Sequence, residues 1–291
     1  MRHFFQSRRK LIVSVILAGL FIGLAAAWIL GGQLCASRNH PVSAPKDLSA
    51  EDVTFPSASG TTIHGWLVLS ATNRGVVILQ HGIRGCRTDM IDRARFLSAA
   101  GYCVLLFDFQ AHGESIGKQI TFGHLESRDS QAAVAFVKQR FPGLPIGVIG
   151  VSLGGATALL AEPPLEVQAL VIELAFPDIV TATKDRLEWI LCRPARLLSP
   201  LLTCQIPMRI GVKLDDLRPI DRVAEITTPK LFLNGTRDPR TKFSEAQEMF
   251  DRAAEPKVFS PVEGAGHVDL HHFLGDRYER LILDFLENNL K

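Results

Sequence analysis

The sequence predicts an α/β fold in which a mostly parallel central sheet carries helices on both faces, with a helical cap insertion and an N-terminal transmembrane helix. From about residue 51 onward, short apolar runs rich in Val, Ile and Phe alternate with longer stretches of helical period. This alternation is typical of parallel crossover units. Residues 176–220 interrupt it, and one uncharged apolar run stands near the N-terminus.

The composition is that of a globular protein. Of 291 residues, 47% are hydrophobic and 21% are charged, which excludes a disordered or collagen-like chain. The 32 basic and 30 acidic side chains leave a net charge of +2, without the clustered basic excess that binds nucleic acid. Five cysteines without C-x-x-C spacing argue against a disulfide scaffold and against structural zinc.

The N-terminal region has the features of a membrane anchor. Residues 11–30 carry no charge, and a helix of about 20 residues crosses a hydrocarbon core of roughly 30 Å. Residues 1–10 form a basic tail with three arginines and one lysine, so the positive-inside bias places the N-terminus in the cytoplasm and the rest on the exported side. We expect a signal anchor at 11–30, a linker at 31–50 and one folded domain over 51–291.

Export followed by signal cleavage is the alternative for this region. The apolar part of a cleaved signal peptide spans only about 7–15 residues, which favours a retained anchor. Ser7-Arg8-Arg9 resembles the start of a twin-arginine export signal. Cys35 would fit a lipoprotein signal, but Leu34 stands where such signals have a small residue.

The expected strands follow from the apolar runs. Val53 to Phe55 and Ile63 to Leu69 flank the turn signal Ser59-Gly60, so an antiparallel hairpin opens the domain. Further strands are expected at 76–80, 104–109, 146–149, 169–174, 230–233 and 257–260. Helical patterns between or after them include 129–138, 153–161 and an amphipathic stretch around 274–285.

The interruption at 176–220 has two interpretations. It is either a helical insert that packs on the sheet edge or a cap that shapes a substrate pocket. We favour the cap, because ligands bind at the carboxyl ends of parallel strands and the insert leaves one such end. Cys192 and Cys204 lie within it and are expected to form a disulfide if the domain faces an oxidising compartment. Cys103 lies in a strand-like run and is expected to be buried.

A nucleophile is predicted at Ser152. Gly150-Val151-Ser152-Leu153-Gly154 directly follows a strand-like run and precedes a helix-like one, the context that the G-x-S-x-G turn requires. Ser115, within Gly113–Gly117, fits the same pattern, but no helical run follows it. A phosphate-binding turn is disfavoured, because neither G-x-G-x-x-G spacing nor a Lys-Ser/Thr ending is present.

A serine hydroxyl needs a neighbouring base to become a good nucleophile. The expected chain order is serine, then a carboxylate, then histidine. Asp238 follows the strand at 230–233 and His267 follows the strand at 257–260, so both loops lie at the same sheet edge as Ser152. Asp178 is the second candidate for the acid.

A metal site is the competing interpretation of the histidine loop. His267, Asp269, His271 and His272 offer ligands at helical spacing. No further paired-histidine motif completes a catalytic zinc site, and we expect neither a metal nor an organic cofactor.

The developing oxyanion needs two backbone N–H donors. Leu153, the residue after the nucleophile, is expected to supply one donor. The loop His81-Gly82-Ile83 after the strand at 76–80 is expected to supply the other, from Ile83.

At these residues the sequence resembles the alpha/beta-hydrolase superfamily, and most of all its serine esterases and peptidases with a modest cap. The matching motifs are His81-Gly82-Ile83, the segment Asp108 to Ser115, the Ser152 turn, and the loops of Asp238 and His267. In that superfamily the Asp108 to Ser115 segment is structural. Gln110 and Ala111 stand where relatives often have Arg and Gly. Relatives that open epoxides or remove halogens carry an aspartate at the position of Ser152.

The resemblance implies the alpha/beta-hydrolase fold and a serine hydrolase that cleaves a carboxylic ester or related acyl bond through an acyl-enzyme. The anchor and the leucine-rich cap favour a lipophilic small-molecule acyl substrate, membrane attachment through the N-terminal helix and no nucleic-acid partner. Two alternatives remain open. One is a serine peptidase that acts on short peptides, with Arg237 or Arg240 as an anchor for a peptide terminus. The other is a catalytically silent binding module.

Overall fold

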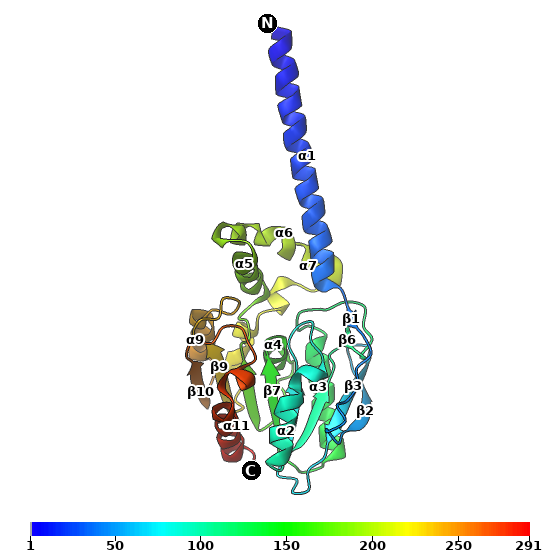
Figure 1. Ribbon diagram of the computed structural model, residues 1–291, viewed down its shortest axis with the longest axis vertical. Coiled ribbons are helices and arrows are strands. Elements are labelled where there is room, and N and C mark those ends of the chain that lie inside the picture. Colours follow the sequence, from blue (N-terminus) through cyan, green and yellow to red (C-terminus); the bar gives the residue numbers. More distant parts are fainter. Residues whose placement is uncertain (1) are drawn as a thin grey trace.

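The computed structural model describes the backbone of residues 2–291 and the side chains from Lys10 onward (Figure 1). Its centre is an eight-stranded sheet of order β10-β9-β8-β7-β4-β5-β3-β2. β3 runs antiparallel to both neighbours, and all other pairs are parallel. The strands are β2 Glu51–Pro56, β3 Thr62–Val68, β4 Val76–Gln80, β5 Cys103–Phe107, β7 Ile146–Val151, β8 Ala169–Glu173, β9 Lys230–Gly235 and β10 Lys257–Val262, and β1 Arg38–Asn39 pairs with β6 His112–Gly113 outside this sheet.

The strand patterns explain this arrangement. In β4, β5 and β8 every residue is buried, because parallel strands are covered on both faces. The predicted hairpin is confirmed as β2 and β3, where β2 alternates between exposed and buried residues. The strand expected at 104–109 ends at Phe107 instead, since Asp108 turns its carboxylate back to bond the backbone N–H of Arg87 at 2.7 Å.

Helices cover both faces of the sheet, as predicted. One face packs against α3, α4, α8 and α9, and the other packs against α2, α10 and α11. The helix expected around 274–285 is divided, because Gly275 at φ +54° turns the chain between α10 and α11. The helices on the two faces are α2 Ile91–Ala99, α3 Glu126–Arg140, α4 Leu153–Leu160, α8 Pro219–Arg222, α9 Phe243–Arg252, α10 Leu270–Leu274 and α11 Asp276–Asn289, with short 3-10 turns at Arg87–Met90 and Val223–Glu225.

The insert at 176–220 is helical and stands above the carboxyl edge of the sheet (Figure 1). It contains α5 Ile179–Ile190, α6 Ser199–Thr203, α7 Gln205–Ile210 and 3-10 turns at Arg193–Leu198 and Leu214–Asp216. The disulfide expected between Cys192 and Cys204 is absent, and both thiols are free and exposed. The 3-10 turn and α6 occupy the chain between the two cysteines, so each thiol lies at a different end of this helical segment. Cys103 is buried, as predicted.

The N-terminal helix α1 runs from Arg2 to Cys35 and leaves the domain beside the cap (Figure 1). The large apolar side chains between Leu11 and Leu30 are exposed. The segment Lys10–Cys35 is long and apolar enough to cross a membrane. The linker expected at 31–50 therefore starts too early, because residues 31–35 complete the helix. The basic tail is expected at residues 1–10. Of its side chains, only that of Lys10 belongs to the described part of the chain.

The lower end of α1 is part of the folded domain. Leu34 and Cys35 pack with α7 residues such as Ile206. The side-chain amide of Gln205 donates to the carbonyl of Ala27 at 3.0 Å. These contacts explain why the helix continues past the apolar run that the sequence marks as the anchor.

A buried ion-pair network links α2 and α11 to the carboxyl end of β8. Arg93 on α2 donates to the Glu173 carboxylate at the end of β8 at 2.8 Å and to the Tyr278 hydroxyl on α11 at 2.9 Å. It also donates to Asp269 at 2.7 Å. Arg93 and Glu173 are almost wholly buried, so each charge depends on the other for compensation.

Replacing Arg93 with methionine is expected to destabilise the protein by about 3–5 kcal/mol, because Glu173 would remain buried without a counter-charge. Urea unfolding of the full chain in detergent micelles measures the change. The control is Arg95→Met on the same helix, where Arg95 pairs with Asp47 at the exposed surface and a loss below about 1 kcal/mol is expected. Equal losses of stability in both variants would contradict the conclusion that Arg93 compensates the buried charge of Glu173.

Candidate active site

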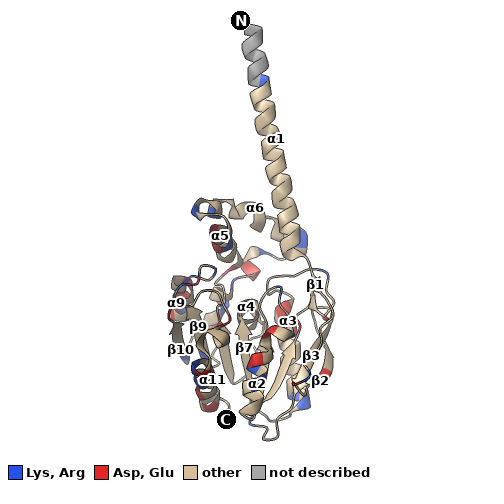
Figure 2. Cartoon of the chain, viewed as in Figure 1, with Lys and Arg blue, Asp and Glu red and all other residues tan. Residues whose placement is uncertain are grey.

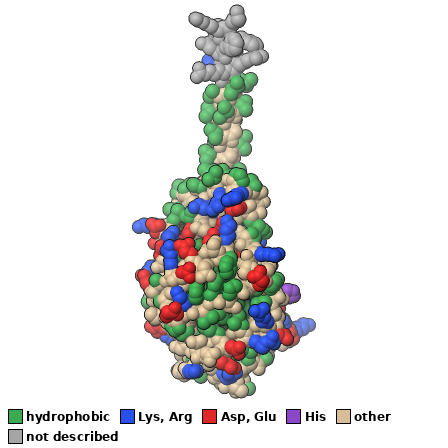
Figure 3. Space-filling model, turned by 90° about the vertical axis from the view of Figure 1, so that its left-hand side faces the viewer, with side chains coloured by type: hydrophobic (Ala, Val, Ile, Leu, Met, Phe, Trp, Pro, Cys, Tyr) green, Lys and Arg blue, Asp and Glu red, His purple; other side chains and the backbone are tan. Residues whose placement is uncertain are grey.

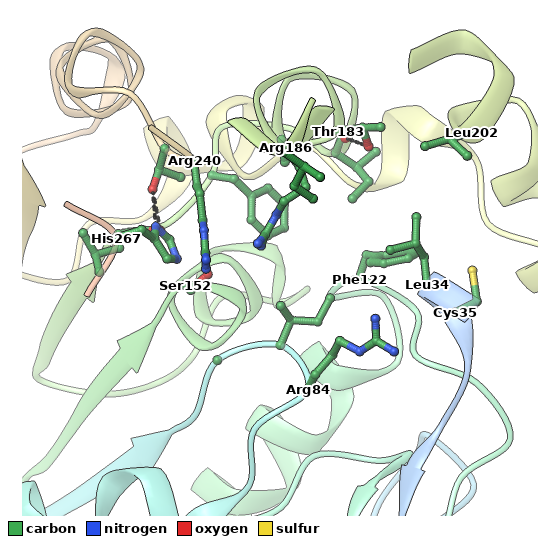
Figure 4. Close-up of a pocket in the computed structure, with 18 of the residues that line it drawn as sticks. Leu34, Cys35, Arg84, Phe122, Ser152, Thr183, Arg186, Leu202, Arg240 and His267 are labelled. Atoms are coloured by element: carbon green, nitrogen blue, oxygen red, sulfur yellow. Dashed lines mark hydrogen bonds between the residues drawn. The ribbon is translucent and has the colours of Figure 1, made fainter. Parts of the chain in front are cut away.

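Ser152 lies in a sharp turn between β7 and α4. Its backbone has φ +52°, an unusual value for a side chain with a Cβ and a mark of local strain. The Ser152 N–H donates to the carbonyl of Glu173 on β8 at 2.7 Å, which holds the turn on the sheet edge. The strained backbone turns the hydroxyl out of the sheet, toward the cavity under the cap (Figure 4).

The glycines on either side of Ser152 allow the turn to close. A Cβ on Gly150 would lie 2.5 Å from the carbonyl carbon of Gly154 and from the nitrogen of Gly155. A Cβ on Gly154 would overlap the backbone carbonyl of Gln80 on β4. Side chains at these positions would push α4 away from the strands, so the G-x-S-x-G spacing is a packing requirement of this turn.

Ser115 has a structural role. It is fully buried, and its hydroxyl donates to the carbonyl of Asp108 at 2.7 Å and accepts the N–H of His64 at 2.9 Å. Ser115 is therefore enclosed by the fold, and the nucleophile at Ser152 stays a prediction. Gly113–Gly117 packs beside the buried ion pair of Arg87 and Asp108, so this segment supports the fold.

Asp238 and His267 meet at the same sheet edge. Nδ1 of His267 lies 2.7 Å from Oδ2 of Asp238, and the aspartate is buried while the histidine reaches the cavity. The backbone N–H groups of Arg240 and Thr241 donate to the other carboxylate oxygen at 2.7 and 3.0 Å. The carboxylate thus fixes the ring and leaves Nε2 toward the cavity that Ser152 also lines (Figure 4).

The charge of Asp238 is stabilised despite its burial. Burial alone would raise the pKa of its carboxyl group, but the hydrogen bond and charge of His267, with the two backbone N–H groups, lower that pKa below its usual value. The ionised carboxylate of Asp238 accepts a hydrogen bond from Nδ1 of His267 and so holds the imidazole proton on that nitrogen. The other ring nitrogen is then free to accept a proton.

Thr241 is a member of this site that sequence reasoning missed. Its hydroxyl lies 2.8 Å from Asp238 Oδ2 and 3.0 Å from His267 Nδ1. The available signal was the spacing from Asp238, which lets an aspartate accept the N–H groups two and three residues later. Among the described residues, Ser152 Oγ makes no hydrogen bond to His267, a contact that often tightens only when substrate is bound.

The competing acid and the metal interpretation fit the structure less well. Asp178 caps α5, where it accepts the N–H of Thr181 at 2.8 Å, and it does not contact His267. Asp269 is occupied by Arg93, and His271 bonds Glu279 at 3.0 Å. No group of three potential metal ligands occurs among the residues described.

Two buried histidines hold the loop that carries Ile83. The Phe109 N–H donates to Nε2 of His81 at 3.1 Å, so Nδ1 carries the proton and donates to the Gly82 carbonyl at 2.7 Å. The backbone N–H of Arg84, the residue after Ile83, donates to His112 Nε2 at 3.1 Å. In a trans peptide the carbonyl and the following N–H point in opposite directions. The bond from His81 therefore turns the N–H of Ile83 away from the core.

The second expected donor lies close to this loop. Leu153 is the first residue of α4, and the N–H groups of a first helical turn have no partner within the helix. A Cβ on Gly82 would lie 3.8 Å from the Cβ of Ser152, so the two loops are neighbours. The strands that carry them, β4 and β7, pair directly with Gln80 opposite Gly150.

The site opens into a cavity of 760 Å³ between the sheet edge, the cap and α1. Ser152 and His267 lie at one end of it, and Phe122, Leu202 and Leu34 lie toward α1 (Figure 4). The expectation that the insert forms a cap over a pocket therefore agrees with the structure. The sequence did not indicate that α1 would contribute to the same wall.

Known proteins are similar to this chain in sequence or in structure. Residues 71–203 match the family described as serine aminopeptidase, S33. The YqkD protein of Bacillus subtilis is 26% identical over 241 residues, covering 80% of this chain and 78% of YqkD. Monoglyceride lipase of Homo sapiens is 25% identical over 233 residues, covering 68% of this chain and 77% of the lipase. The structure of the Pyrococcus furiosus esterase Pf2001 is similar with a TM-score of 0.72 and 26% identity, covering 88% of this chain and 100% of the esterase.

The parallel sheet, its two helical layers and the strand-turn-helix at Ser152 define an alpha/beta hydrolase fold. The chain belongs to the alpha/beta-hydrolase superfamily. The resemblance seen in the sequence motifs is thereby confirmed at the level of fold and superfamily.

The buried histidine His81 makes stability depend on pH. Burial lowers the pKa of His81 to about 3, whereas an unfolded histidine titrates near 6.5. Between these values the unfolded chain binds a proton that the folded chain does not. Stability therefore falls as the pH drops from 6.5 toward 3, by up to about 1.4 kcal/mol per pH unit for this group.

The variant His81→Gln is expected to show a shallower pH dependence of the free energy of unfolding between pH 6 and 4 than the unmodified protein. The difference between the two urea-unfolding series isolates the contribution of position 81. His272→Gln, at an exposed position, serves as the control and should run parallel to the unmodified protein. A parallel series for His81→Gln as well would contradict the prediction.

Proposed function

We propose that the protein is a membrane-anchored serine hydrolase that cleaves a carboxylic ester through an acyl-enzyme. The observation that carries the proposal is the placement of Ser152, in a strained turn, on the cavity that the Asp238-bonded His267 also lines. The esterase and lipase among the relatives support an ester as the substrate.

In the proposed mechanism, Nε2 of His267 takes the proton of Ser152 as the hydroxyl oxygen attacks the ester carbonyl. Asp238 keeps the ring in the required tautomer and stabilises the imidazolium that forms. The backbone N–H groups of Ile83 and Leu153 bind the oxyanion. His267 then gives its proton to the departing alcohol, and a water molecule, activated by the same ring, releases the acyl group from Ser152.

A serine peptidase is the second candidate, because residues 71–203 match a serine aminopeptidase family. An aminopeptidase needs a carboxylate to bind the free amino terminus of its substrate. The carboxylates on the cavity wall are Asp89 and Asp269. Asp269 pairs with Arg93, and Asp89 accepts the N–H of Cys86 at 3.4 Å. This arrangement favours an ester over a peptide with a free amino end.

Attachment to a membrane is part of the proposal. The described part of α1 carries no charge between Lys10 and its lower end (Figure 2), and apolar side chains surround it above the domain (Figure 3). Exposed apolar side chains continue across the cap, at Trp189, Ile190, Leu191, Leu197, Leu198, Leu201 and Met208. A domain held by α1 would present this cap to the bilayer surface, where a lipophilic ester can enter the cavity.

Ser152→Ala is expected to lower turnover of an acyl ester by about 10⁶ and to abolish labelling by a fluorophosphonate probe. Ester hydrolysis by the purified full chain and gel-based labelling measure the two effects. The matched control is Ser115→Ala, which removes the rival hydroxyl and should retain labelling when its circular dichroism is unchanged. A folded, unlabelled unmodified protein would instead support a silent binding module.

The positive-inside bias predicts that the catalytic domain lies on the exported side. A membrane-impermeant maleimide should therefore label the exposed Cys192 and Cys204 in right-side-out membrane vesicles without detergent. A Ser7→Cys variant that also carries Cys192→Ser and Cys204→Ser should react only after the vesicles are permeabilised. The opposite pattern would reverse the proposed orientation, and release of the domain into the soluble fraction would indicate signal cleavage.

A further inference from the structure

The cavity wall carries more positive than negative charge. Four arginines line it, at positions 84, 186, 209 and 240, against two carboxylates, Asp89 and Asp269. Asp269 already pairs with Arg93. The remaining lining is largely apolar. Arg84 and Arg209 contact α1, at Gln33 and Trp28, whereas Arg186 and Arg240 form a separate pair at Trp189 of the cap.

Arg186 and Arg240 approach the nucleophile from two different elements. Arg186 extends from α5 of the cap, and Arg240 extends from the loop between β9 and α9. Both side chains are half-buried, and in Figure 4 both are directed into the cavity, with the guanidinium of Arg240 toward Ser152. The ring of Trp189 supports them, at 4.1 Å from the central guanidinium carbon of Arg240 and 5.7 Å from that of Arg186.

Neither guanidinium has a carboxylate partner among the described residues. No ion pair or side-chain hydrogen bond of Arg186 or Arg240 occurs there, whereas the acids of α5 on the other side, Asp185 and Glu188, pair with Lys242. Asp238 is nearby but is committed to His267 and Thr241. Burial, then the neighbouring Arg240, lowers the pKa of Arg186, which agrees with a crowded and partly desolvated pair of positive charges.

Arg84 adds a third guanidinium to the cavity wall, on the side of α1. Its Nε is buried without a hydrogen-bond partner in the described part of the chain, and its Nη2 donates to the carbonyl of Gln33 on α1 at 3.2 Å. A half-buried guanidinium without a counter-ion is unfavourable. An anionic group of a ligand would relieve that cost and form charge-assisted hydrogen bonds.

We propose that Arg186 and Arg240 bind an anionic group of the substrate, so that the preferred substrate is a single-chain acyl ester that carries a phosphate or carboxylate close to the scissile bond. The inference rests on the proposed ester hydrolysis and names its substrate class. The arginines lie at the Ser152 end of the cavity, whereas Phe122, Leu202 and Leu34 line the part toward α1 (Figure 4). The anion and the reacting carbonyl would therefore share one end, and the hydrocarbon chain would occupy the other.

Three esters with the same acyl chain test this specificity. They are dodecanoyl glycerol, dodecanoyl glycerol phosphate and dodecanoyl glycerate, each assayed with the full chain in nonionic detergent. We expect the KM of at least one charged ester to be about tenfold lower than that of the neutral ester, and the ester with the lower KM identifies the anion. Equal KM values for all three, or the lowest KM for the neutral ester, would overturn the inference.

The variants Arg186→Gln and Arg240→Gln test whether these two arginines cause the lower KM for the charged ester. Each should raise the KM for the charged ester about tenfold, with less than a twofold change for the neutral ester. Arg186→Lys should recover part of the loss, because it restores the charge without the planar fork. Arg280→Gln, at an exposed position on α11, is the control and should change neither KM. Equal changes for charged and neutral esters would indicate a structural role for the arginines and overturn the inference.

A binding measurement separates this inference from the proposed reaction. Calorimetry of dodecyl phosphate with the Ser152→Ala variant requires no hydrolysis. Binding that weakens about tenfold when Arg240→Gln is added, with no such change on adding Arg280→Gln, would support the anion site even if no ester is cleaved. Hydrolysis of the neutral ester, with no detectable binding of either dodecyl phosphate or dodecanoate in the same measurement, would leave the proposed function intact and overturn the anion site.

Discussion

The buried ion pair between Arg93 and Glu173 is the interaction on which the arrangement of the site depends. Glu173 ends β8, and its backbone carbonyl holds the N–H of Ser152. The same arginine holds Asp269, two residues after His267. One guanidinium in a nearly dry environment thus ties the turn of Ser152 to the loop of His267. Because a lone buried charge is costly, the pair resists separation and limits how far these two loops can move apart.

Packing and hydrogen bonds within the protein hold the turns at the sheet edge in place. Glycines let α4 approach β4, and the strain at Ser152 is maintained by the packing around it. His81 acts on the neighbouring loop through the Gly82 carbonyl. In open α/β sheets, ligands generally bind beyond the carboxyl ends of two neighbouring strands whose connections lead to opposite sides of the sheet. In this sheet that position lies between β4 and β7.

The cavity above this edge combines elements that are distant in sequence. Its walls come from the sheet loops, the cap and the lower end of α1. The apolar residues Phe122, Leu202 and Leu34 lie toward the helix proposed to cross the membrane, and Arg186 and Arg240 lie toward Ser152 (Figure 4). This polarity matches an amphiphile that enters from a bilayer with its polar group near the nucleophile. The cap would then serve both as a wall of the pocket and as the surface that faces the lipid.

The sequence by itself determined the alternation of strands and helices, the hairpin, the Ser152 turn and the order of Ser152, Asp238 and His267, because these depend on local periodicity and on glycines at fixed spacing. It did not determine the partners of Arg93, the contact of Thr241 with His267 or the meeting of Arg186 with Arg240. The apolar run at 11–30 also did not show that the helix continues to Cys35. The disulfide between Cys192 and Cys204, expected for an oxidising compartment, is not formed in this structure. Only the tertiary structure decided these points, because they depend on which side chains meet across long sequence separations, and local pattern carries no information about such distances.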